Sequence, residues 1–220
     1  MPLRPLRQPS FVLLCGLVAI LLAYPFLETS PLGRELLAAV GLVVLVLCVH
    51  IVGTGRRRAL PGWVLAGLAI AANAAYVLWE QPVLGLYTTI AYAAFYAYAI
   101  ASLVAYVLRD DIATYDELFA AVCLYIFIAM FLACLYWIVK YFQPEAFYVN
   151  PVNNIDGRVT WWDLLYFSFT TLTSTGYGEI TPVTSHARSV AMLQQITGVM
   201  YVALLVARLA NLLPRRRVGP

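Results

Sequence analysis

The chain has 220 residues, of which 63% are hydrophobic and only 11% are charged, with a net charge of +3. Soluble domains average about 25% charged residues, so the composition excludes an ordinary soluble protein and predicts an all-α membrane protein. Free cysteine in an apolar run behaves as a small buried hydrophobe, so we expect no disulfide and no metal site. The cysteines, all in such runs, are Cys15, Cys48, Cys123 and Cys134.

Six apolar segments are expected to span the membrane, because each is near the ~20 residues that a bilayer core requires. The first has an apolar core at residues 11–24 that continues to about residue 27. A signal peptide is the alternative for this short core, but no clear small-residue cleavage site follows it. The remaining spans are expected at residues 36–52, 61–79, 83–108, 118–142 and 188–213.

Two helix starts show the spacing of a capping box, with a hydroxyl residue three positions before an acid. Thr114 opens the fifth span in this way, and Thr160 with Asp163 opens a short aromatic helix over residues 161–173. That helix is too short to cross a bilayer. The stretch before it, residues 143–160, is rich in Pro, Asn and charge, and is expected to be a loop.

The short helix runs into a segment in which two glycines flank a tyrosine and follow a run of hydroxyl residues. A dehydrated cation needs oxygens all round it, and a filter supplies them as rings of backbone carbonyls. Consecutive carbonyls point inward only if ordinary and left-handed dihedrals alternate, and glycine reaches positive φ without steric cost. Gly176 and Gly178 therefore permit a filter, and Ser174 adds a hydroxyl at its inner end. The alternative is a glycine-rich turn that holds no ion.

The stretch Thr171-Leu-Thr-Ser-Thr-Gly-Tyr-Gly-Glu179 resembles the selectivity filter of the potassium-channel pore family, whose pattern is Thr-x-Thr-Thr-Val-Gly-Tyr-Gly-Asp. The resemblance covers roughly residues 117–213 and implies a bacterial-type six-span relative of voltage-gated cation channels. It implies a homotetramer, with a re-entrant pore helix and a filter loop between helices five and six. The residues implied to bind potassium ions are Ser174, Thr175, Gly176, Tyr177 and Gly178.

The chain departs from the family pattern at three positions: Ser174 in place of threonine, Thr175 in place of valine, and Glu179 in place of aspartate. In the family a pore-helix tryptophan holds that aspartate, and Tyr166 and Phe167 fall where two tryptophans are usual. We expect these two aromatic residues to support the filter, with Tyr166 or Arg188 binding Glu179. The departures leave a weakly selective cation channel as the alternative function, and a non-conducting membrane interaction subunit as another.

The sixth span is expected to line the inner cavity. Gly198 lies where the resemblance places a hinge, although close packing against a neighbouring helix is the plainer reason for a mid-helix glycine, which costs about 1 kcal/mol relative to alanine. Apolar residues follow it at helical spacing, and four copies of them would form a constriction that closes by dewetting. The expected gate residues are Val202, Val206 and Ala210.

Residues 1–112 are expected to form a four-helix transmembrane module, and residues 113–220 a pore domain of outer helix, pore helix, filter and inner helix. The fourth span contains no charged residue before Arg109, and a charge-free span gains no energy from voltage. We therefore predict little voltage dependence. Small residues recur along this span every four positions, which favours tight helix packing over a site for a lipid or small molecule.

Arginine and lysine placement predicts orientation, because cytoplasmic loops are enriched in both. A cytoplasmic N-terminus puts these residues inside: Arg4, Arg7, Arg56, Arg57, Arg58, Arg109, Arg208, Arg215, Arg216 and Arg217. It puts fewer outside: Arg34, Lys140, Arg158 and Arg188. We expect a multi-pass protein of the plasma (inner) membrane with both termini cytoplasmic. The Arg56–Arg58 run is interpreted as an orientation anchor, with an anionic-lipid site as the alternative.

The sequence shows no membrane-embedded acid pair, histidine cluster or Ser/His/Asp set, so we expect a protein that is not an enzyme. His50 is interpreted as an interfacial residue, with pH sensing as the alternative. The expected surroundings are the lipid bilayer and further copies of the chain, with no nucleic acid and no soluble partner implied.

Overall fold

A computed structural model describes residues 8–27, 41, 44, 46, 48, 56–108, 114–152, 154 and 157–212. Within these residues, five helices are long and apolar enough to cross a membrane, and a short sixth helix and two short strands accompany them. The long helices are α1 (Pro9–Leu27), α3 (Arg56–Trp79), α4 (Pro82–Val107), α5 (Tyr115–Phe142) and α7 (Ser185–Leu212). The short elements are β1 (Phe147–Val149), α6 (Trp161–Leu172) and β2 (Ile180–Pro182).

Five of the six expected spans are thus confirmed as long apolar helices. The second expected span, residues 36–52, lies outside the described residues except for Gly41, Val44, Val46 and Cys48, which are helical. Further expectations also fall outside them: His50, the side chains of Arg56–Arg58, Arg109, and Arg215–Arg217.

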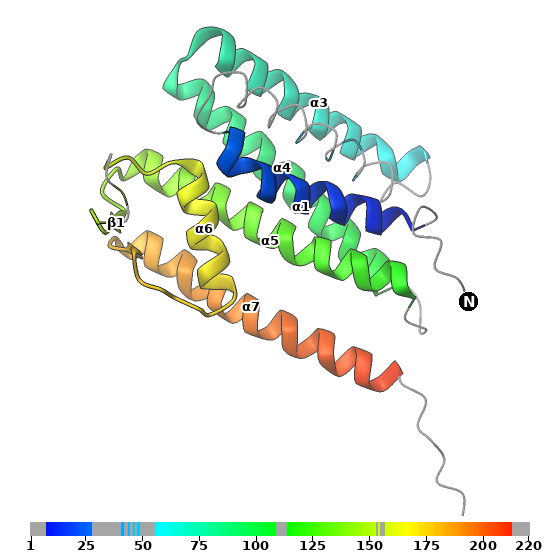
Figure 1. The fold of residues 1–220 in the computed structure, drawn as a ribbon. Coiled ribbons are helices and arrows are strands. Elements are labelled where there is room, and N and C mark those ends of the chain that lie inside the picture. Colours follow the sequence, from blue (N-terminus) through cyan, green and yellow to red (C-terminus); the bar gives the residue numbers. More distant parts are fainter. Residues whose placement is uncertain are drawn as a thin grey trace, which may run out of the picture.

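The long helices lie side by side, with α5 between α4 and α1 on one side and α6 and α7 on the other (Figure 1). α3 packs on the far side of α4. The strand β1 and the start of α6 lie at one end of this bundle. The starts of α1 and α5 and the end of α7 lie at the opposite end (Figure 1).

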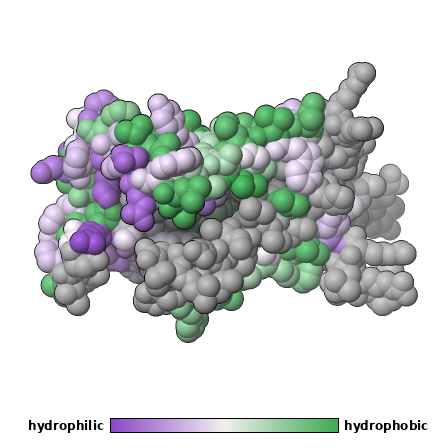
Figure 2. All heavy atoms as spheres, turned by 90° about the horizontal axis from the view of Figure 1, so that it is seen from above, coloured by the Kyte–Doolittle hydropathy of each residue, from purple (hydrophilic) through white to green (hydrophobic). Residues whose placement is uncertain are grey.

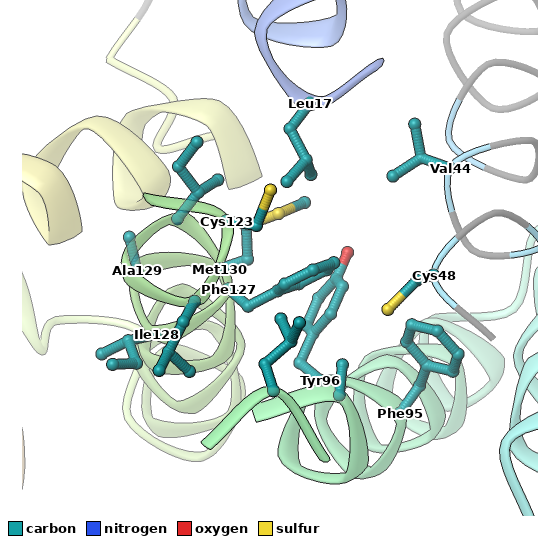
Figure 3. Close-up of a cluster of buried hydrophobic side chains, with 14 of the residues drawn as sticks. Leu17, Val44, Cys48, Phe95, Tyr96, Cys123, Phe127, Ile128, Ala129 and Met130 are labelled. Atoms are coloured by element: carbon teal, nitrogen blue, oxygen red, sulfur yellow. The ribbon is translucent and has the colours of Figure 1, made fainter. Parts of the chain in front are cut away.

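α5 is the helix on which the others pack, and its middle is buried on most sides. Cys123, Phe127 and Ala133 are each fully buried, and small residues on α5 let neighbouring helices approach closely. One continuous core joins Leu17 of α1 and Phe95 of α4 to Phe127 (Figure 3). α1 and α4 therefore pack directly on α5 within one chain.

Both predicted capping sites are present. The Thr114 hydroxyl accepts the Glu117 N–H at the start of α5, at 3.3 Å. At the start of α6 the Thr160 hydroxyl accepts the Asp163 N–H, and the Asp163 carboxylate accepts the Thr160 N–H in return. These bonds satisfy donors that a helix start leaves without intrahelical partners, so α6 begins at Trp161 as expected.

The expectation of an irregular loop over residues 143–160 is wrong in one part. Phe147–Val149 forms β1, which pairs antiparallel with β2, and Tyr148 lies opposite Thr181. The strand is only three residues long and its partner lies more than thirty positions away, so no local apolar period marks it. α7 also begins at Ser185, three residues before the expected start, because Thr184 accepts the Arg188 N–H at 3.0 Å.

The surface agrees with a membrane protein. Figure 2 shows hydrophilic side chains gathered at the end that carries β1, and hydrophobic side chains over the middle of the bundle. Large apolar side chains are exposed along the long helices, among them Leu68, Tyr87, Leu193 and Leu204. Water does not favour such a surface, whereas lipid or further helices would cover it.

Candidate ion-conduction site

The short helix α6 ends directly before the expected filter. Its twelve residues extend about 18 Å, well short of the ~30 Å bilayer core. Leu164, Leu165, Ser168 and Leu172 are buried against the neighbouring helices. The negative end of the α6 dipole is therefore fixed next to the segment that follows Leu172.

The filter segment, residues 174–178, has the backbone that the two glycines predicted. Gly176 has a φ of 57° and Gly178 a φ of 90°, both in the left-handed region. Ser174 is also left-handed, with a φ of 57°, which the sequence did not indicate. This conformation costs an ordinary residue roughly 1–2 kcal/mol, so the surrounding bonds must hold it.

Backbone and hydroxyl groups of α6 hold the start of the filter segment. The N–H groups of Thr175 and Gly176 both donate to the carbonyl of Thr170, at 2.9 and 3.2 Å. The hydroxyls of Thr173 and Thr175 lie 2.8 Å apart, and Thr173 also donates to the Phe169 carbonyl at 2.8 Å. The left-handed turn at Ser174 is thus anchored on both sides.

Glu179, just beyond the filter segment, is bound by Tyr166 of α6. The Tyr166 hydroxyl donates a hydrogen bond to Glu179 Oε1. This bond to the carboxylate, with some burial, raises the pKa of Tyr166 to about 12. The alternative partner was wrong, because the Arg188 Nε donates to the Pro182 carbonyl at 3.1 Å. Among the described residues, the one ion pair joins Arg208 and Glu117.

Phe167 packs in an aromatic cluster with Tyr136 of α5 and Phe147 of β1. The Phe167 ring centroid lies 5.0 Å from that of Tyr136 and 5.6 Å from that of Phe147. All three side chains are buried. Edge-on and tilted contacts at these distances are favourable between aromatic rings, so Phe167 packs without needing the N–H that tryptophan would supply.

The β1–β2 pair fixes the chain as it leaves the filter segment. The Asn150 N–H donates to the Glu179 carbonyl at 2.8 Å, and the Val183 N–H donates to the Ala146 carbonyl at 2.8 Å. Backbone bonds therefore hold both ends of the filter segment, on α6 at one end and on β1 at the other.

A buried polar network that sequence reasoning missed joins α5, α6 and α7 next to the filter. Gln194 is fully buried, and its Nε2 donates to the carbonyl and the hydroxyl of Ser168 at 2.8 and 2.7 Å. Tyr136 donates to Gln194 Oε1, and Ser168 donates to the Ala129 carbonyl at 2.7 Å. The available signal was a glutamine pair at positions 194 and 195 inside an apolar span.

Gly198 lies directly against the end of α6. A Cβ at this position would stand 1.9 Å from the Leu172 carbonyl oxygen, a distance that real Cβ atoms do not adopt. The Tyr125 hydroxyl donates to the same oxygen at 3.1 Å. Close packing, one of the two reasons expected for this glycine, is therefore present. Hinge bending remains a prediction.

Residues 117–215 match the Ion_trans_2 family, described as ion channel. The matched region begins in the first turn of α5 and covers α6, the filter segment and α7. No curated protein matches the chain in sequence. The match also favours a protein that is not an enzyme.

Within the matched region, one chain leaves the filter segment open. Residues 173–178 are exposed, with Tyr177 at 70%. A cavity of about 370 Å³ lies beside them, between Phe167, Gly176 and Ala191. The described residues of one chain therefore do not enclose this segment.

The expected gate residues lie on α7 beyond Gly198, and the structure does not bring them into contact with the filter. Val202 and Val206 are 49% and 59% exposed, and Ala210 is exposed as well. Within one chain they form an apolar face without a partner. The gate role of these three residues remains a prediction.

Proposed function

We propose that the protein is a homotetrameric potassium-selective channel that conducts through the carbonyls of residues 174–178. The observation that carries the proposal is the short helix α6, which ends at a segment with positive φ at both Gly176 and Gly178 inside a match to the ion-channel family. This backbone lets successive carbonyls point to one side, as a cation filter needs.

A ring of four chains would enclose the filter segment that a single chain leaves exposed. Four copies place four filter segments around one axis, with α6 as a re-entrant pore helix. Irregular backbone at membrane depth is tolerated only where protein or a water-filled cavity surrounds it, so a lone filter segment facing lipid is disfavoured. The apolar face at Val202 and Val206 then lines the inner cavity.

The proposed setting is the plasma membrane, with both termini cytoplasmic and the filter loop outside. α4 contains no charged residue between Pro82 and Val107, so we propose a channel in which this helix does not act as a voltage sensor.

A weakly selective cation channel is the second candidate, and it rests on the departures from the family pattern. Ser174, Thr175 and Glu179 stand in place of the family's threonine, valine and aspartate. Such changes in and next to the filter segment would alter how well it discriminates potassium from sodium.

Cation flux into liposomes tests both candidates. Purified protein is reconstituted, and potassium, rubidium, sodium and lithium gradients are compared, with barium as the blocker. Flux of potassium and rubidium alone, stopped by barium, supports the first candidate. Equal sodium flux supports the second. A Gly178→Ala variant, which forces a side chain into the left-handed position, is the control and should abolish flux.

A further inference from the structure

Two consecutive acids at the start of α5, Asp116 and Glu117, contact different parts of the molecule. They lie in the first turn of the helix, at the end of the bundle opposite β1 (Figure 1). Neighbouring residues on a helix point about 100° apart. One acid therefore faces α1 and α4, and the other faces α7.

Asp116 binds the helices that precede the matched region. Its carboxylate accepts the Ser10 N–H at 3.0 Å and the Ser10 hydroxyl at 2.8 Å, at the start of α1. It also accepts the Tyr106 hydroxyl, near the end of α4, at 2.7 Å. A carboxylate at a helix start satisfies its free N–H groups and complements its dipole, so Asp116 joins the ends of α1 and α4 to α5.

Glu117 binds the far end of the inner helix. Its carboxylate lies 3.7 Å from the guanidinium of Arg208 on α7. Glu117 is only 5% exposed, so water screens this pair less than a surface pair. About two turns away on α7, Tyr201 donates to the Ala121 carbonyl of α5.

The contacts of α7 toward α5 and α6 follow a regular spacing. Gln194, Tyr201 and Arg208 are seven residues apart, so they lie on one face of the helix. Gln194 reaches Tyr136 beside the filter, and Arg208 reaches Glu117 at the opposite end. Tyr201 and Arg208 lie beyond Gly198 and, with the packing of Leu205 on the core, help to hold the part of α7 that carries Val202 and Val206.

We propose that Asp116 and Glu117 couple α1 and α4 to the end of α7, so that displacement of those two helices changes the position of the gate-bearing half of α7. Asp116 is held by α1 and α4, Glu117 holds Arg208, and the backbone of α5 joins the two acids. The proposal rests on the proposed channel function for its effect on conduction, but the mechanical link itself does not require conduction.

A mutant cycle across the two contacts tests the coupling. Tyr106→Phe removes the α4 donor, and Arg208→Gln removes the α7 cation. The two single variants and the double variant are each compared with the unmodified full-length protein by potassium flux in liposomes. Coupling predicts that both single variants change the flux in the same direction. It also predicts that the fold-change in flux of the double variant differs by about threefold or more from the product of the two single fold-changes. Independent effects that multiply would overturn the proposal.

Matched variants control for general damage. Tyr87→Phe alters an exposed tyrosine at the other end of α4, and Arg188→Gln removes an arginine at the other end of α7. Their double variant should give effects that multiply. Restoration of flux by the charge exchange Glu117→Arg with Arg208→Glu would support the ion pair as the working contact.

Hydrogen exchange separates failure of the coupling from failure of the channel function. In the full-length protein, Tyr106→Phe should raise exchange in the last turns of α7 about threefold or more. The same change should have no effect on α7 when Arg208→Gln is present. Raised exchange without potassium flux in the unmodified protein would overturn the channel function and support the coupling. Unchanged α7 exchange would overturn the coupling, with or without flux.

Discussion

The hydroxyl of Tyr166 donates a hydrogen bond to the carboxylate of Glu179, across thirteen residues of chain. The bond joins the helix α6 to the position directly after Gly178. Together with the Asn150 N–H, which donates to the Glu179 carbonyl, it fixes both the side chain and the backbone of this residue. The outer end of the proposed filter is therefore tied to α6 and to β1 at once.

Tyr166→Phe removes only the donor of this bond and should weaken the outer end of the filter by about 1 kcal/mol, since the site is partly exposed to water. We expect faster loss of potassium current during sustained opening, measured in single-channel or flux recordings. Arg188→Gln is the control, because Arg188 contacts the Pro182 carbonyl instead. A Tyr166→Phe channel whose current persists like that of the unmodified protein would contradict this role.

Gln194→Leu should destabilise the protein by about 2 kcal/mol, because it leaves buried partners on Tyr136 and Ser168 without a hydrogen bond. For a chain of this length that loss corresponds to a fall of about 4–8 °C in the thermal midpoint, measured in detergent. Gln195→Leu is the matched control, since the adjacent glutamine is exposed and its replacement should change the midpoint little. Equal effects of the two variants would exclude the network as a source of stability.

Local rules predicted the parts of the site that depend on neighbouring residues. The capping box at Thr160 places the start of α6, and the glycine pair predicts the positive φ of Gly176 and Gly178. Each of these follows from side chains within three residues of the position concerned. The same reasoning predicted the apolar spans, because the bilayer sets their length.

Local sequence rules could not predict the contacts between segments that are distant in the chain. The sequence offered Tyr166 and Arg188 as partners of Glu179, and only the folded arrangement shows that the carboxylate lies next to the tyrosine. Ser174 reads as an ordinary hydroxyl residue, and its left-handed backbone follows from the bonds that Thr170 accepts. The partners of Gln194 likewise depend on how α5, α6 and α7 cross.

Gly198→Ala distinguishes packing from bending. The added methyl group would meet the Leu172 carbonyl, and overpacking of this kind costs about 1–3 kcal/mol. Packing predicts a lower thermal midpoint together with altered ion selectivity, because Leu172 lies two residues before Ser174. Bending predicts an unchanged midpoint with altered opening. Gly67→Ala in α3 is the control, since nothing lies within 4 Å of its Cβ position.

Val206→Asp tests the apolar stripe beyond Gly198 as a gate. Val206 is 59% exposed within one chain, so in the proposed tetramer its side chain is free to face the pore. Four apolar side chains at a constriction close it by expelling water, and a carboxylate at each position keeps it wet. We therefore expect Val206→Asp to raise the potassium flux of liposomes and to make it persist under conditions in which the unmodified channel is closed.

Val206→Leu preserves the apolar character and should leave closure intact. Because Val206 is far from residues 174–178 in sequence and lies beyond Gly198 on α7, selectivity should not change. An unaltered open probability in Val206→Asp would place the constriction elsewhere on α7.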